Sequence, residues 1–196
     1  MKIISFEGTE GVGKSTQIEL LKKFLEKNYK SVEVFREPGS TLSGEKIRDI
    51  LLDDQYELSS KTELLLMFSA RSELVNKKIN NSTADYLLLD RFFDASLAYQ
   101  GYGRNLSIEL INKLVDFIDC PIPDLSFLID ISVEEGFARK INDKIDRIES
   151  SGNDFFNKVR NGYIEIAKNN EDRFIIINGS KTVDEIHNNI IQNIDI

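Results

Sequence analysis

Short apolar runs alternate along the chain with longer segments whose apolar residues recur at helical spacing. The apolar runs are residues 3–6, 32–35, 86–89, 125–129 and 174–177. They are continuously apolar, which is typical of parallel strands covered on both faces. The segments with helical periodicity are residues 17–28, 44–52, 62–79, 107–119, 133–141, 153–168 and 183–194. This alternation predicts an α/β fold, a doubly wound parallel sheet of about five strands flanked by helices.

The chain is long enough for one core, and we predict a single domain over residues 1–196. Residues 140–153 differ in character from the rest, because they mix charged residues with small polar ones. We interpret the segment at about 139–153 as a mobile lid, and an ordinary solvated loop is the alternative.

The overall charge is acidic, with 33 Asp and Glu against 25 Lys and Arg and a net charge of −8. This balance argues against nucleic acid or an anionic membrane as the main partner, but a nucleotide needs only a few local cations. The single cysteine, Cys120, excludes an intrachain disulfide, and its neighbours Pro121 and Pro123 favour a structural thiol. No apolar stretch approaches ~18–20 residues and no signal-like segment opens the chain, so we expect a cytoplasmic protein.

A glycine-rich loop, G-x-x-x-x-G-K-S at residues 8–15, lies between the first strand and the first helix. Glycines let successive backbone N–H groups turn toward one anionic point. Lys14 adds a positive charge for the β- and γ-phosphates, and the Ser15 hydroxyl is a ligand for Mg²⁺. A chance glycine-rich turn is the alternative, but the strand before the loop and the helix after it favour a phosphate-binding loop.

Charged residues also follow the second and third strands, where ligands bind in such sheets. Arg36 and Glu37 end the second strand, and Arg48 follows in the next helix as either a surface residue or a phosphate ligand. Asp90 ends the third strand as a Walker B carboxylate that can hold Mg²⁺ opposite Ser15. Arg91 beside it can reach a second phosphate in front of the loop.

Two further groups of residues suit a nucleobase. The helical segment that follows Arg91 offers a hydroxyl, an aromatic ring and an amide that can read a base edge. These groups belong to Ser96, Tyr99 and Gln100, which stand at helical spacing. Core packing for Tyr99 and a solvated surface for Gln100 are the alternatives.

In the long helix before the third strand, Met67 and Phe68 precede Arg71 by three to four residues, so an apolar surface and a cation share one face. Phe68 is by default a core residue. A stacking role against a base would contribute ~1–3 kcal/mol, with the arginine donating to a ring carbonyl or a phosphate.

Taken together, these motifs resemble the bacterial thymidylate kinase family of P-loop nucleoside monophosphate kinases. The resemblance rests on F-E-G-x-E-G-x-G-K-S-T at residues 6–16, R-E-P-G-x-T at 36–41, D-R-F-x-x-x-S-x-A-Y-Q-G at 90–101, D-R-x-E at 146–149 and F-F-x-x-V-x-x-x-Y at 155–163. The third of these is close to diagnostic among P-loop kinases, whereas the first is not. The resemblance implies phosphorylation of dTMP to dTDP with ATP and Mg²⁺, in a homodimer.

The resemblance also implies residue roles. ATP would bind Gly8, Thr9, Glu10, Gly11, Val12, Gly13, Lys14, Ser15 and Thr16, with Ser15 and Asp90 near the metal. The nucleotide dTMP would bind Glu37, Arg48, Met67, Phe68, Arg71, Arg91, Ser96, Tyr99 and Gln100. The catalytic cations would be Lys14, Arg91, Arg139 and Arg147. Because the glycine-rich loop carries no arginine, the lid would supply Arg139 and Arg147.

The chain departs from the family pattern at several places. The family's stacking aromatic stands four residues before the arginine, where this chain has Met67, with Phe68 one residue later. Lys140 and Lys144 stand in the lid where arginines are common, and lysine lacks the bidentate fork of a guanidinium. Ser40 replaces a glycine, which matters only if φ is positive there.

Two other functions are alternatives for a chain with this loop. A different P-loop small-molecule kinase would share the loop and the lid, but it gives no reason for the motif at residues 90–101. A nucleotide-driven switch or motor would carry D-x-x-G and N-K-x-D elements, or a glutamate beside Asp90 where this chain has Arg91.

Overall fold

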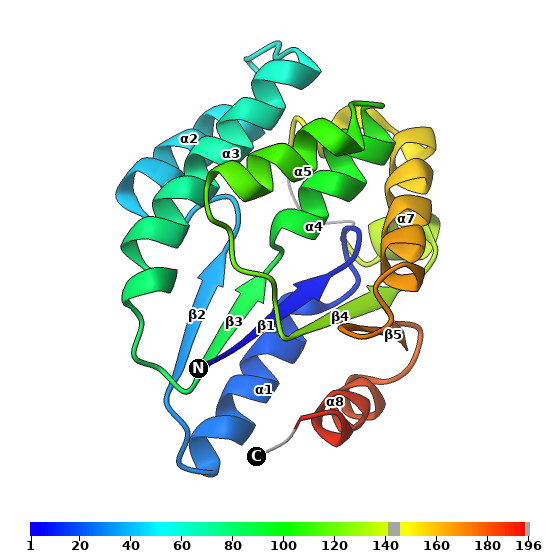
Figure 1. The fold of residues 1–196 in the computed structure, drawn as a ribbon. Helices are drawn as coiled ribbons and strands as arrows, with labels where there is room; N and C mark the ends of the chain where they lie inside the picture. Colours follow the sequence, from blue (N-terminus) through cyan, green and yellow to red (C-terminus); the bar gives the residue numbers. More distant parts are fainter. Residues whose placement is uncertain (141–145, 195–196) are drawn as a thin grey trace.

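In the computed structural model, which describes residues 1–140 and 146–194, the chain folds around a five-stranded, all-parallel sheet (Figure 1). The strands are β1 (Lys2–Glu7), β2 (Val32–Arg36), β3 (Tyr86–Asp90), β4 (Leu125–Asp130) and β5 (Phe174–Asn178). Their order across the sheet is β2-β3-β1-β4-β5. The predicted fold class, a doubly wound parallel α/β sheet, is confirmed.

The central strand β1 shows why the strands read as apolar runs. Ile4 of β1 lies in register with Leu88 of β3 on one side and with Leu125 of β4 on the other. All but one of the residues of β1 are buried, because helices cover both faces of the sheet. A strand in this position has no solvent face, so its sequence does not alternate.

Helices lie on both sides of the sheet. The longer ones are α1 (Lys14–Lys27), α2 (Leu42–Leu52), α3 (Ser60–Lys77), α5 (Ile108–Phe117), α7 (Asn153–Lys168) and α8 (Val183–Gln192). Four of them begin after a side-chain cap, Thr41, Ser59, Ser107 and Thr182, each of which accepts a hydrogen bond from a backbone N–H of the first turn. Each cap satisfies a donor that the first turn otherwise leaves without a partner.

Shorter elements follow the strands and were less well predicted. After β3 come α4 (Phe93–Ser96) and a π-helical segment, Leu97–Gly103, labelled η2. Two single 3₁₀ turns, η1 (Ile79–Asn81) and η3 (Glu149–Ser151), lie outside the main helices. The helix expected at residues 133–141 is described only as α6 (Val133–Ala138), and Lys144, expected in the lid, lies outside the described residues.

Two apolar clusters fill the two sides of the sheet. One gathers the inner faces of α3, α4, α5 and α7, with Phe92, Phe156 and Tyr163 among its largest buried side chains. The other packs α1 and α8 under β1 and β4, with Phe6 and Phe127 at its centre. Figure 1 shows this separation, with α1 and α8 on one side of the sheet and α7 on the other.

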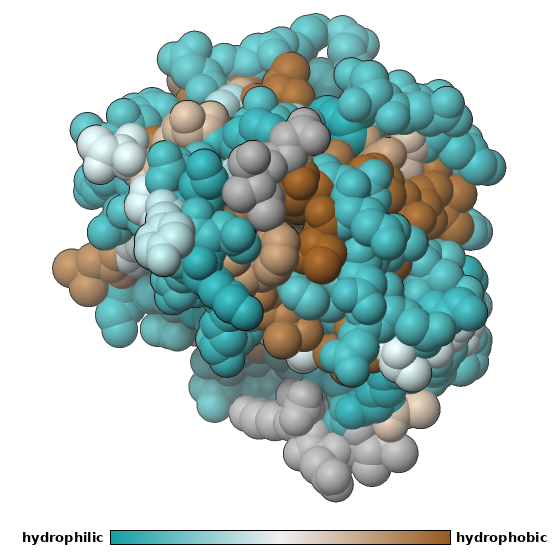
Figure 2. Space-filling model, turned by 90° about the horizontal axis from the view of Figure 1, so that it is seen from below, coloured by the Kyte–Doolittle hydropathy of each residue, from teal (hydrophilic) through white to brown (hydrophobic). Residues whose placement is uncertain are grey.

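The surface is largely polar. Seen from below the view of Figure 1, most of it is hydrophilic, and apolar residues gather near the middle of the view (Figure 2). Among the helices of residues 1–140 and 146–194, none has the length and apolar content of a membrane span.

Candidate active site

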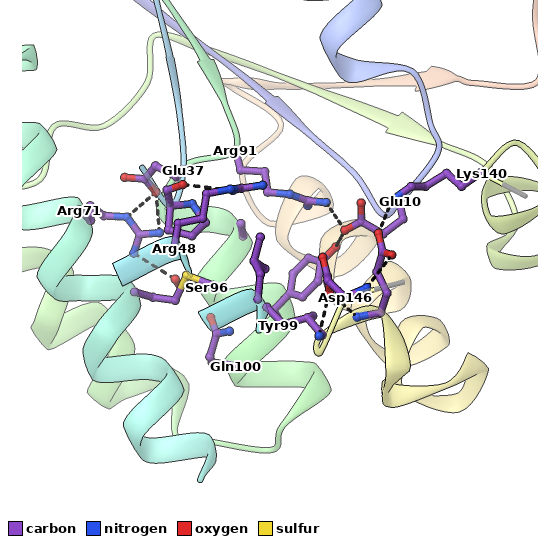
Figure 3. Close-up of a pocket in the computed structure, with 16 residues that line it drawn as sticks. Glu10, Glu37, Arg48, Arg71, Arg91, Ser96, Tyr99, Gln100, Lys140 and Asp146 are labelled. Carbon is purple, nitrogen blue, oxygen red and sulfur yellow. Dashed lines mark hydrogen bonds and ion pairs between the residues drawn. The ribbon is translucent and has the colours of Figure 1, made fainter. Parts of the chain in front are cut away.

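Three segments that follow β1, β2 and β3 meet at the carboxyl edge of the sheet, as parallel strands require. They line two adjoining cavities, one of about 170 Å³ and one of about 440 Å³. The larger, here called the phosphate cavity, is lined by the glycine-rich loop. The smaller, here called the nucleoside cavity, is drawn in Figure 3. Five residues line both cavities: Glu10, Glu37, Arg48, Arg91 and Lys140.

The glycine-rich loop lies between β1 and α1, as the sequence predicts. Gly13 has φ 95° and ends the loop, and α1 begins at Lys14. The ammonium of Lys14 donates to the carbonyl oxygens of Gly8, at 3.2 Å, and Thr9, at 2.9 Å. Burial, with the neighbouring Arg91 charge, lowers the pKa of Lys14 to about 8. The loop residues that line the phosphate cavity are Glu10, Gly11, Val12, Gly13, Lys14, Ser15 and Thr16.

Gly11 is required by a close approach to α6. A Cβ at Gly11, which has φ 69°, would lie 1.9 Å from the carbonyl oxygen of Gly136. The reverse also holds, since a Cβ at Gly136 would lie 2.3 Å from the carbonyl oxygen of Glu10. The two glycines therefore let the glycine-rich loop touch the helix that leads to Arg139.

Ser15 and Asp90 come together as predicted. The Ser15 hydroxyl donates to Asp90 Oδ2 at 3.0 Å, and both side chains line the phosphate cavity. Within the described part of the chain, no three His, Cys, Asp or Glu side chains gather into a metal cluster. One hydroxyl and one carboxylate beside a phosphate-binding loop fit Mg²⁺, which keeps most of its water and is completed by phosphate oxygens.

Arg91 lines both cavities, and its guanidinium points toward Glu10 (Figure 3). Its guanidinium donates to the Gly8 carbonyl at 2.7 Å and to Glu10 Oε1 at 2.6 Å, and it lies over the Tyr99 ring. Burial opposes the charge, but the oxygens of Tyr99 and Glu10 hold the pKa of Arg91 well above its ordinary value. Burial alone would raise the pKa of Glu10, yet Arg91 and Lys14 lower it to about 2. Both partners are therefore charged.

Glu7 and Tyr163 complete this network, although sequence reasoning assigned a role to neither of them. Glu7 Oε1 accepts a hydrogen bond from the Phe92 N–H at 2.8 Å, and Oε2 accepts one from the Tyr163 hydroxyl at 3.0 Å. That hydroxyl in turn accepts from Arg91 at 3.2 Å. Burial, with the nearby Asp94 charge, raises the pKa of Glu7 to about 8. Glu7 lies in the motif at residues 6–16 and Tyr163 in the motif at 155–163, so the sequence marks both positions. It cannot show that the two side chains touch.

On the far wall of the nucleoside cavity, Arg71 joins two predicted residues. Its Nε donates to Glu37 Oε2 at 2.8 Å, and a second nitrogen donates to the Ser96 hydroxyl at 3.0 Å. Arg71 is 2% exposed and Glu37 is 5% exposed. Burial raises the pKa of Glu37, although Arg71 opposes this. Glu37 Oε1 is buried and accepts no hydrogen bond from the described residues, so it remains available to a ligand donor.

The structure separates Met67 from Phe68. Met67 lines the nucleoside cavity, whereas Phe68 belongs to the apolar core and packs its ring under the Arg71 guanidinium, 4.7 Å away. Ser96, Tyr99 and Gln100 all line the cavity from α4 and the π-helical segment. The alternative of a solvated surface for Gln100 does not hold, because Gln100 is 1% exposed.

Arg48 stands at the boundary of the cavities. One of its guanidinium nitrogens donates to the Pro38 carbonyl at 3.1 Å. The turn that presents this carbonyl contains a cis Glu37–Pro38 peptide, and Ser40 in the same turn has φ 64°. Serine in place of the family's glycine therefore matters at position 40, because φ is positive there.

The two cations that the sequence assigned to a lid lie in different places. Arg139 ends α6, donates to the Gly179 carbonyl at 3.1 Å and lines the phosphate cavity with Lys140. Arg147 instead donates to the Leu51 carbonyl and to Glu63 Oε2, both at 2.8 Å, and it is not among the described residues that line either cavity. The structure therefore does not bring Arg147 to the phosphates with Arg139.

The nucleoside cavity decides the class of protein. A nucleotide hydrolase needs only a phosphate site and water, whereas a kinase needs room for an acceptor beside the triphosphate. Here a second, partly apolar cavity adjoins the phosphate cavity, and cations line the wall between them. The fold and the site thus define a P-loop kinase.

Comparisons with known proteins give the family. The thymidylate kinase family model matches residues 6–190. The thymidylate kinase of Thermoanaerobacter sp. (strain X514) is 44% identical over 97% of this chain and 95% of its own length. That of Kosmotoga olearia is 42% identical over 96% and 93%. The crystal structure of thymidylate kinase from Ehrlichia chaffeensis has a TM-score of 0.80 at 33% identity, over 97% of this chain and 96% of that one. The chain belongs to the thymidylate kinase family and is a kinase.

Proposed function

We propose that the chain transfers the γ-phosphoryl group of ATP to dTMP and so forms dTDP, with Mg²⁺ as the metal. The observation that carries this proposal is the position of Arg91, which lines both cavities. The glycine-rich loop lies on one side of it and the nucleoside cavity on the other. A cation in that position can neutralise the repulsion between two phosphates that must meet.

The phosphate cavity supports the donor site. Lys14 and Arg139 bring positive charge to the transferring group, and bound Mg²⁺ would add charge neutralisation next to Ser15 and Asp90. No general base is needed, because a phosphate monoester oxygen is largely ionised at pH 7. The chemical task of the protein is therefore to align two anions and exclude water.

The nucleoside cavity supports a pyrimidine acceptor. Arg48 and Arg91 would hold the acceptor phosphate, and Met67 and Tyr99 would contact the base. Arg71 would donate to a ring carbonyl, and Glu37 Oε1, which accepts no hydrogen bond from the described residues, would accept one from a sugar hydroxyl. We expect a purine to be accepted less well, because its two-ring base would not meet Arg71 and Gln100 as a pyrimidine does. Thymine and uracil differ by one methyl, worth ~1–3 kcal/mol in a fitted pocket, so rejection of dUMP is partial.

The deciding experiment is a coupled assay of ADP formation with ATP, Mg²⁺ and a panel of nucleoside monophosphates. We expect dTMP to give the highest kcat/KM, dUMP a lower value, and dGMP and dAMP no stimulation. An ADP-formation rate that dTMP does not raise above the ATP-only rate would refute the proposal. Direct detection of dTDP separates transfer from stimulated hydrolysis.

Assembly and location complete the proposal. We place the enzyme as a homodimer in the cytoplasm, whose reducing conditions suit the free thiol of Cys120. Exposed apolar side chains on α3 and α5, including Leu65 and Phe117, support a contact between two copies. Light scattering after size exclusion tests the dimer, which Phe117→Asp and Leu65→Asp should weaken if their helices form the interface.

A further inference from the structure

Glu63, in the first turn of α3, is a buried carboxylate without a role in the proposed chemistry. It is 1% exposed and accepts hydrogen bonds from three side chains. Gln100 Nε2 donates to Oε1 at 3.0 Å, Arg147 to Oε2 at 2.8 Å, and Arg104 to both oxygens at 3.3 Å. A carboxylate so far inside a protein needs such partners to remain ionised.

The charge on Glu63 is secured by these partners. Burial alone would raise its pKa, but the hydrogen bond from Gln100, the charge of Arg104 and the hydrogen bond from Arg147 hold the pKa below its ordinary value. Arg104 is itself fixed, because it lies 4.2 Å from the centre of the Phe155 ring. Glu63 therefore acts only as an acceptor at neutral pH.

An acceptor-only partner fixes the direction of the Gln100 amide. An amide has a donor end and an acceptor end of almost equal size, so nothing in its shape favours one direction over the other. Because a carboxylate accepts and cannot donate, it binds the NH₂ end of Gln100, and the carbonyl end faces away from Glu63. Gln100 lines the nucleoside cavity on the same side as Ser96 (Figure 3).

The direction of this amide distinguishes pyrimidines at N3. Thymine and uracil carry an N3–H donor, whereas cytosine has an unprotonated N3 that accepts. If the Gln100 carbonyl faces the base, it accepts a hydrogen bond from the N3–H of thymine or uracil. With cytosine, the carbonyl oxygen and N3 are both acceptors and face one another without a proton between them. A mismatch of this kind between buried polar groups discriminates more strongly than an extra methyl does.

We propose that Glu63 is a positioning residue that sets the specificity for the base by holding the Gln100 amide with its carbonyl toward N3. Glu63 touches no substrate atom in this role and acts only through Gln100. The inference rests on the proposed dTMP kinase function, because it assumes that the nucleoside cavity holds a pyrimidine. It adds Glu63 of α3, acting through Gln100, to the residues that control recognition of the base.

The test is the substitution Glu63→Gln, which keeps the shape and allows the new NH₂ group to donate to Gln100, so that the Gln100 amide can turn round. We expect the ratio of kcat/KM for dTMP to that for dCMP to fall by at least about tenfold. The ratio for dTMP to dUMP should stay within about twofold, because these bases share the N3–H. A loss of structure would lower both ratios, so the pair of ratios separates positioning from general loosening.

Two controls complete the design. Glu57→Gln makes the same chemical change at an exposed position and should leave both ratios unchanged. Arg104→Gln removes one ion pair from Glu63 while keeping the Glu63–Gln100 contact, and it should also preserve the dCMP discrimination. If Glu63→Gln does not fold, Glu63→Asp keeps the charge and withdraws the carboxylate from Gln100 by one methylene, with the same expected change.

Unchanged dCMP discrimination in the folded Glu63 variants would overturn the inference, as would an equal effect of Arg104→Gln. These failures are distinct from failure of the proposed function. A wild-type chain that does not phosphorylate dTMP refutes the function, whereas an active wild type with unaltered ratios in the Glu63 variants refutes only the role of Glu63.

Discussion

The Ser15 hydroxyl donates to Asp90 Oδ2 at 3.0 Å, which joins the start of α1 to the end of β3 across 75 positions of sequence. Both groups are hard oxygen ligands that line the phosphate cavity. The position of β3 beside β1 in the sheet is what brings them together.

This contact predicts the effect of Asp90→Asn. The substitution keeps the size of the side chain and removes the negative charge, so Mg²⁺ binding should weaken. We expect the Mg²⁺ concentration for half-maximal rate to rise and kcat to fall by on the order of 10²-fold. A magnesium titration of the kinase reaction measures both. An unaltered magnesium dependence in a folded variant would remove Asp90 from the metal site.

The division of the lid cations predicts unequal effects of their removal. Arg139 lines the phosphate cavity, so Arg139→Ala should lower kcat by about 10²-fold at saturating ATP. Arg147 serves Glu63 and the Leu51 carbonyl, so Arg147→Ala should cost about 1–3 kcal/mol of stability and lower kcat far less. Steady-state kinetics and thermal unfolding of the two variants compare them directly. Equal losses of kcat would show that Arg147 reaches the phosphates during the reaction.

Glu7 predicts a pH dependence of stability. Its pKa rises from 4.5 to about 8 in the folded chain, chiefly through burial. The folded state therefore binds a proton that the unfolded state releases, and this stabilisation is full below pH 4.5 and is lost as the pH rises through about 8. Glu7→Gln cannot lose that proton. We expect its melting temperature relative to wild type to shift upward between pH 6 and pH 8.5, by roughly a few degrees.

The difference in melting temperature between Glu7→Gln and wild type is taken at each pH, because the contributions of all other titrating groups cancel in it. A constant difference across the range would show that Glu7 is not the group responsible. Phe6→Leu, a change in the neighbouring core, is a control that should lower stability equally at every pH.

Ser40 predicts a contrast between two small residues. It has φ 64°, and its hydroxyl accepts from the Arg36 N–H at 2.7 Å. Ser40→Ala loses this bond and keeps the cost of a left-handed backbone, whereas Ser40→Gly loses the bond but removes the cost. The alanine variant should therefore be less stable than the glycine variant by about 1 kcal/mol. Urea unfolding measures this difference. Equal free energies of unfolding for Ser40→Ala and Ser40→Gly would contradict the prediction.

Much of the fold could be predicted because its signals are local. Each strand is a continuous apolar run and each long helix has its own periodicity, so neither depends on distant residues. The rule that ligands bind at the carboxyl ends of parallel strands then pointed to Lys14, Glu37 and Asp90 before their contacts were known. The π-helical segment was not predicted, because its seven residues lack a period that distinguishes them from an α-helix.

The sequence by itself determined the order of strands and helices, the glycine-rich loop and the charged residues at strand ends, since each is written in a short stretch of neighbouring residues. Only the tertiary structure decided that Met67 and not Phe68 lines the cavity, that Arg147 turns to Glu63, and that Glu63 holds Gln100. These are choices among partners far apart in the chain. They are set by how helices pack against one sheet and by which buried charges must be paired, and no local pattern records either.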